Sequence, residues 1–213
     1  EKEPGVRSYM KRVDYEDKIR KTLESLSDAG EILKLGWTAL QGCLWDVAVS
    51  CFERIRSDFS EVTKAEDAEL GLGIALLHLG REEEAERWLR GYLDKNPDSA
   101  AGHLNLFKAY LLLQEDERAW EEIQAAAMLS PGNHEALQQL FAFFEKTGRD
   151  EEGMEILKCL ERENPKVAAP LLLQAKFQDE KGDWKKAEEL LREALRREPE
   201  EETVLLYYSS ALG

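Results

Sequence analysis

The amino-acid sequence predicts an all-α protein, built as a solenoid of antiparallel helix pairs stacked along the chain. The first observation is a period: Pro97, Pro131, Pro165 and Pro199 follow one another at equal intervals of 34 residues. The second is that small and large apolar residues recur at fixed places within each interval. A period of about 20 to 50 residues is the signature of an array in which each unit buries its apolar face against its neighbours.

Five units are predicted when each is counted from position 1 to position 34. They run over 29–62, 66–99, 100–133, 134–167 and 168–201, with three additional residues after the first unit. Position 20 is small and position 24 is large, as in Ala48 and Phe52 of the first unit, and position 8 is glycine in the first two. Small residues at positions 8 and 20 allow two helices to approach closely, and large residues at positions 11 and 24 fill the space beside them.

Turn residues support the same division into helix pairs. Gly80, Gly148 and Gly182 stand at position 15, where glycine takes the left-handed conformation that ends a first helix. In the first unit Cys43 stands there instead. Acidic residues follow several of these positions, and the helix dipole favours them at the start of a second helix.

Capping residues are also readable from the sequence. Asp28 with Glu31 predicts a capping box at the start of the first unit. The pairs Asn96-Pro97, Ser130-Pro131 and Asn164-Pro165 predict a capping residue and a proline at the entry of the next helix.

The two ends of the chain hold incomplete units. Residues 1–28 form an amino-terminal segment with one helix at about 15–27, on which Ile19, Leu23 and Leu26 share a face. Residues 202–213 fit the first helix of a partial sixth repeat or a cap. This last helix is apolar, so we expect either that the native chain continues or that the helix packs against something, such as a second copy. Self-association through the terminal helices is therefore a further hypothesis.

The repeating pattern resembles the tetratricopeptide repeat family, in which a small residue at position 8, alanine at 20, a large apolar residue at 24 and proline at 32 recur. The resemblance covers residues 29–201 and implies a right-handed solenoid. It also implies that the first helix of each unit lines a concave groove, into which positions 2, 5, 9, 12 and 13 point.

These groove positions predict the partner-binding residues. In the first three units they are mainly apolar: Leu33, Trp37, Leu40, Leu70, Ile74, Leu77, His78, Leu104, Lys108, Leu111 and Leu112. In the last two units they are charged and mixed: Gln138, Glu145, Lys146, Leu172, Lys176, Asp179 and Glu180. An exposed apolar patch of this size usually marks a contact surface.

The predicted function is therefore that of a non-catalytic scaffold or adaptor, which binds an amphipathic helix or extended peptide of a partner protein around Trp37, Ile74 and Leu111. Two alternative roles for the apolar patch stay open: its leucines pack against the following helix, or the chain's own amino-terminal segment covers them. The alternative function is an accessory region of a larger enzyme, such as a transferase, whose catalytic domain lies outside these residues.

One activity of this family is disfavoured by the residues. Family members that hold the carboxylate end of a chaperone tail use Lys at position 5 and Asn at position 9. Here the first unit has Leu33 and Trp37 at those positions, and the second has Leu70 and Ile74. A carboxylate in that groove would lack charged donors.

Charge and composition exclude several classes of function. The chain has 44 Asp and Glu against 29 Lys and Arg, a net charge of −15, so we expect no binding to nucleic acid or to an anionic membrane surface. No apolar run is long enough for direct membrane insertion. Three scattered cysteines make no disulfide framework, and they favour a cytoplasmic location.

Sequence motifs for catalysis are also missing. No Cys-x-x-Cys or His-Glu-x-x-His spacing occurs, so we expect no metal site. Gly71-Leu72-Gly73 fits a close-packed helix rather than a phosphate-binding loop, and His103 falls at a packing position. We therefore expect no catalytic residues and no cofactor.

Overall fold

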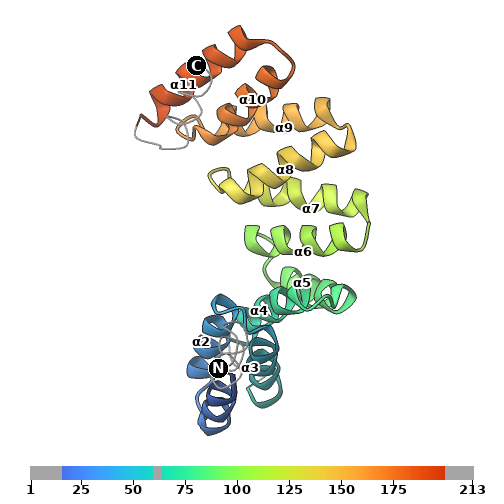
Figure 1. Cartoon of the computed structure of the whole chain (residues 1–213), viewed down its shortest axis with the longest axis vertical. Helices are drawn as coiled ribbons and strands as arrows, with labels where there is room; N and C mark the ends of the chain where they lie inside the picture. Colours follow the sequence, from blue (N-terminus) through green and yellow to red (C-terminus); the bar gives the residue numbers. More distant parts are fainter. Residues whose placement is uncertain (1–15, 60–63, 200–213) are drawn as a thin grey trace, which may run out of the picture. The chain divides into compact units, whose positions relative to one another are not determined.

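The computed structural model describes residues 16–59 and 64–199, and every regular element in them is a helix. Residues 16–25 form the first. The others are α2 (Ala29–Gln41), α3 (Trp45–Asp58), α4 (Lys64–His78), α5 (Glu82–Lys95), α6 (Ala100–Leu112), α7 (Asp116–Leu129), α8 (His134–Thr147), α9 (Asp150–Glu163), α10 (Ala169–Glu180) and α11 (Trp184–Arg197) (Figure 1). The all-α prediction is confirmed. The expected helix at 202–213 lies outside the described residues.

The helices form two compact parts. The first holds α2 to α5 and the end of α6, and the second holds the start of α6 and α7 to α11. In the first part α2 packs on α3, α3 on α4 and α4 on α5, and α2 also contacts α4. In the second part α8 packs on α9, α9 on α10 and α10 on α11, and α8 also contacts α10. Helix pairs are thus stacked with first helix against first helix, as in a helical solenoid. The predicted unit boundaries themselves remain a prediction.

The core shows why position 8 is glycine in the first two units and why position 20 is small. A Cβ atom added to Gly36 would lie 2.6 Å from the ring of Phe52, and one added to Gly73 would lie 2.6 Å from Leu89. A Cβ atom at Gly153, at position 20, would overlap the ring of Phe144. Because the three large side chains are fully buried, the close approach of the helices depends on these glycines, as predicted.

Position 15 is left-handed in all five predicted units. The φ angles are 56° at Cys43, 69° at Gly80, 60° at Gln114, 70° at Gly148 and 82° at Gly182. Glycine tolerates this region without steric cost, whereas residues with a side chain rarely adopt it. The fold therefore imposes the same turn where the sequence offers no glycine.

The predicted helix entries at the prolines are wrong in position. Asn96 and Asn164 lie at the carboxyl ends of α5 and α9, and Ser130 directly follows α7. The next first helices begin later: Ser99 accepts a hydrogen bond from a backbone N–H at 3.1 Å, and Asn133 caps α8 in the same way. Capping residue types stand on both sides of Pro97 and Pro131, so the local pattern alone did not distinguish the two sides. After Pro165 no side chain caps α10, which begins behind Ala168. At the start of α2, Asp28 accepts from the Glu31 N–H at 2.9 Å, as expected.

The amino-terminal helix, 16–25, is held by α3. Ile19 and Leu23 on this helix are buried. Arg54 of α3 donates hydrogen bonds to the carbonyl oxygens of Leu23 and Leu26, the latter at 2.7 Å. A guanidinium at the end of a helix satisfies carbonyl groups that have no partner within the helix. These contacts attach the segment to α3, the second helix of the first unit.

Candidate partner-binding surface

In the first compact part, predicted groove residues lie on two helices that touch each other. Leu33 and Trp37 of α2 are half-buried, and so are Leu70, Ile74 and Leu77 of α4. Ile32 and Ala39 of α2 and Leu72 and Leu76 of α4 are fully buried. Each helix therefore has a buried face and a partly exposed apolar face. The half-buried residues are the part of the predicted surface that a partner could still cover.

Other predicted groove residues have different surroundings. Leu40 and Leu104 are only 8% and 4% exposed, so they belong to the core. Lys108 and Leu111 are half-buried, and Leu112 is 55% exposed.

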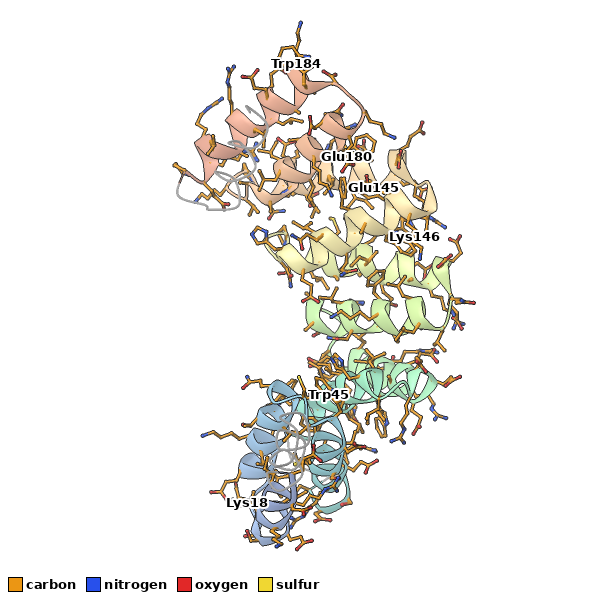
Figure 2. The ribbon with its side chains drawn as sticks, viewed as in Figure 1. Lys18, Trp45, Glu145, Lys146, Glu180 and Trp184 are labelled. Carbon is orange, nitrogen blue, oxygen red and sulfur yellow. The ribbon has the colours of Figure 1, made fainter. Side chains whose placement is uncertain are left out.

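The exposed His78 completes this set, and its ring stacks on an indole. The centroids of His78 and Trp45 are 3.9 Å apart, and the ring planes differ by 6°. Trp45, labelled in Figure 2, is half-buried at the start of α3. This stacking packs the tryptophan against the end of α4.

The second compact part has a pocket of about 460 Å³ between the first helices α8 and α10. Leu137, Phe141 and Ala142 line it from α8, and Leu172 and Lys176 line it from α10. The remaining lining residues are His134, Gln138, Gln139, Ala169 and Leu173. Its lining combines apolar side chains with the polar side chains of His134, Gln138, Gln139 and Lys176, a common composition for a binding site.

The pocket lies at groove positions whose residues are charged and mixed in the sequence. Gln138, Leu172 and Lys176 are predicted groove residues, whereas the prediction does not include Ala142 and Ala169. Both alanines are small residues at groove positions, which is the signal that could have found the hollow. Its existence depends on the spacing of two helices that are 34 residues apart in the sequence.

Charged side chains gather one helical turn beyond the pocket. Glu145 at the end of α8 and Glu180 at the end of α10 lie next to each other (Figure 2), and their carboxyl groups share a hydrogen bond. The side chain of Glu145 is exposed, yet some loss of hydration, this hydrogen bond and the negative charge of Glu180 raise its pKa to about 7. Lys176 lies 3.6 Å from Glu180, with its ammonium 4.4 Å from the ring centre of Phe141.

A second, shallower hollow of about 370 Å³ lies between α9 and α10. Met154 and Phe177 are among its lining residues, as are Asp150 and Lys158. Asp150 is engaged by Lys181 at 2.9 Å, which raises the pKa of that lysine. This hollow is part of the packing between a second helix and the next first helix.

The described residues offer no metal centre. Within 16–59 and 64–199, no three His, Cys, Asp or Glu side chains come together as metal ligands would. His103 is half-buried, with Nδ1 2.6 Å from a carboxylate oxygen of Glu122.

Among the described residues, no helix is both long enough and apolar enough to span a membrane.

Comparisons with known proteins agree with this architecture. Residues 33–100 match the family described as tetratricopeptide repeat. Comparison with curated proteins gives no match.

Solved structures share the fold at low sequence identity. TTC0263, a thermophilic TPR protein in Thermus thermophilus, is 19% identical, with a TM-score of 0.54, over 87% of this chain and 99% of that one. YrrB, a TPR protein with an unusual peptide-binding site, is 18% identical, with a TM-score of 0.54, over 90% and 97%. A tetratricopeptide repeat protein from Parabacteroides merdae ATCC 43184 is 14% identical, with a TM-score of 0.59, over 86% and 72%.

The match at residues 33–100 covers the first helix pairs, and the solved structures share the stacked arrangement over most of the chain. Both agree with the period, the small residues and the left-handed turns found above. Residues 33–100 therefore match the tetratricopeptide repeat family, and the chain shares the fold of solved tetratricopeptide repeat proteins.

Proposed function

We propose that this chain is a non-catalytic scaffold that binds a segment of a partner protein on the surface of its first helices. The observation that carries the proposal is the pocket between α8 and α10. It opens at the helix positions that family resemblance assigns to the groove. The similar protein YrrB is described as having a peptide-binding site, which supports a peptide as the class of ligand.

The half-buried apolar residues of the first part form a separate candidate binding surface. Leu33 and Trp37 on α2 and Ile74 on α4 have apolar surface that the described chain leaves partly uncovered. Covering such surface stabilises a complex by about 25 cal/mol for each Å² removed from water. An amphipathic helix or an extended peptide has side chains at the spacing needed to reach these residues.

Selection from a random peptide library displayed on phage tests the proposal. We expect selected peptides to bind the purified chain in fluorescence anisotropy. Ala142→Phe fills the pocket and should weaken peptides that bind at α8 and α10 about tenfold or more. Trp37→Ala or Ile74→Lys should do the same to peptides that bind at α2 and α4. Glu121→Phe is the matched control, because it adds the same ring to the exposed surface of α7, a second helix. Peptides with equal affinity for all four variants and the wild type would refute the proposed surface.

A further inference from the structure

The pocket and the carboxyl pair form one continuous stretch of the surface between α8 and α10. Phe141 lines the pocket, and Glu145 follows it by four residues on α8. Lys176 lines the opposite wall, and Glu180 follows it by four residues on α10. Residues four apart lie on the same face of a helix, about 6 Å apart along its axis. The two carboxyl groups therefore lie about one helical turn from the hollow.

The negative charges at Glu145 and its neighbours outnumber the positive charges close to them. Glu180 and Lys176 face it from α10, and Asp150 contributes negative charge from α9. Lys176 lies 3.6 Å from Glu180, and the ammonium of Lys181 is bound to Asp150 at 2.9 Å. Two adjacent carboxylates repel each other when both are ionised, so the pair keeps a proton to a higher pH when no cation lies between them.

We propose that this surface binds a partner peptide with an apolar side chain in the pocket and a Lys or Arg, about one helical turn away, paired with Glu145 and Glu180. The inference rests on the proposed function and specifies the chemistry of the partner. Leu137, Phe141 and Leu172 supply the apolar walls of the pocket. The ammonium or guanidinium of the partner donates hydrogen bonds to the two carboxylates, which accept them.

Charge complementarity favours a basic partner over an acidic one. The chain has a net charge of −15, which attracts cationic segments and speeds their encounter. An acidic side chain one turn from the pocket would face two carboxyl groups, and the nearby Lys176 is already close to one of them. A basic side chain instead replaces the shared proton, which is released to solvent.

Binding is therefore expected to depend on pH. The pKa of Glu145 is raised to about 7, so this carboxyl group is largely protonated at pH 5.5 and ionised at pH 8. At pH 5.5 the partner cation must displace a proton, whereas at pH 8 it meets two carboxylates. Affinity should therefore rise between these two pH values, and proton release should be measurable by calorimetry in buffers of different ionisation enthalpy.

The test uses the library peptides whose binding is lost in Ala142→Phe. We expect them to share a Lys or Arg three or four residues from an apolar side chain. Replacing that residue by citrulline or norleucine should weaken binding at pH 8 about tenfold, since a hydrogen bond to a charged group contributes about that factor. The double variant Glu145→Gln/Glu180→Gln should show the same loss at pH 8 and a smaller one at pH 5.5.

A matched control separates local pairing from long-range attraction. Glu83→Gln/Glu121→Gln removes two negative charges from exposed positions on the second helices α5 and α7, and it should change affinity less than twofold. Circular dichroism checks folding, and we expect the Glu145→Gln/Glu180→Gln variant to be at least as stable as wild type at pH 8, because repulsion is removed.

Two results would overturn the inference while leaving the proposed function intact. In the first, peptides whose binding depends on the pocket bind the Glu145→Gln/Glu180→Gln variant as tightly as wild type. The other is selection of peptides with Asp or Glu, rather than Lys or Arg, at the turn beyond the apolar residue. If no selected peptide depends on the first-helix surface, the proposed function itself fails, and this inference fails with it.

Discussion

Gly36→Ala tests the close packing of helices that defines this fold. A Cβ atom at this position would lie 2.6 Å from Phe52, whereas ordinary contacts begin at 3.4 Å, so the ring would have to move by 0.8 Å (3.4 − 2.6). The ring is fully buried, and the same end of it lies against Gly71 of α4. Overpacking in such a site costs about 2–3 kcal/mol, and replacing a helical glycine by alanine recovers about 1. We therefore expect a net loss of about 1–2 kcal/mol.

Gly91→Ala is the matched control. This glycine lies within α5 in the same compact part of the chain, and a Cβ atom there would have no neighbour within 4 Å. The same chemical change should therefore stabilise the protein by about 0.5–1 kcal/mol. Urea unfolding followed by circular dichroism measures both effects. Hydrogen exchange of peptides covering 29–58 locates the loss in the first helix pair, because repeat arrays do not always unfold in one step.

A double-mutant cycle tests the mechanism. Phe52→Leu removes the end of the ring that Gly36→Ala would meet, so the double variant should lose less stability than the sum of the two single variants. We expect a coupling of about 1 kcal/mol. If Gly36→Ala is as stable as wild type while Gly91→Ala behaves as expected, the reasoning from close packing is wrong.

Three further predictions concern the first compact part and the helix turns. Cys43→Gly and Gln114→Gly should each stabilise the chain by about 0.5–1 kcal/mol in urea unfolding, because these residues have φ angles of 56° and 60°. Burial raises the pKa of the Cys51 thiol from 9.0 to about 11, although nearby arginines partly offset the rise. The stability that the buried neutral thiol contributes is therefore complete below pH 9 and is lost as the pH rises through 11. A maleimide reagent at neutral pH should react with Cys43 and spare Cys51. Arg54→Ala should speed amide exchange in 16–25, because the carbonyl groups at the end of that helix lose their donor.

Each of these predictions has its own contrary outcome. A loss of stability in Cys43→Gly would show that the turn is not strained. Equal labelling of Cys43 and Cys51 in the folded protein would contradict the burial of the second thiol. Unchanged exchange in 16–25 would mean that apolar contacts alone hold the amino-terminal helix, and Arg192→Ala, an exposed substitution on α11, serves as the control for that experiment.

Local sequence signals predicted the helices well because helix ends depend on near neighbours. Gly80, Gly148 and Gly182 mark turns whose φ angles are 69°, 70° and 82°. Their signal is specific, since few other residues adopt that conformation readily. The entries of the next first helices were less specific, because Ser130 and Asn133 are both good capping residues and lie on either side of Pro131.

The candidate site was less predictable because it depends on contacts between distant segments. Leu40 and Leu104 are apolar residues at predicted groove positions, yet both are buried. Ala142 carries little signal by itself, and it becomes part of a pocket only because α10 lies opposite α8. The meeting of Glu145 and Glu180 has the same origin, since 35 residues separate them in the sequence.

The sequence by itself determined the repeat, the helix pairs and the small residues at which they touch, because each follows from periodicity and from the conformational limits of glycine and proline. The tertiary structure decided which groove positions stay exposed, where a hollow forms and which carboxyl groups lie side by side. Those properties depend on the distance between stacked helices, and that distance is set by packing of side chains from several repeats at once.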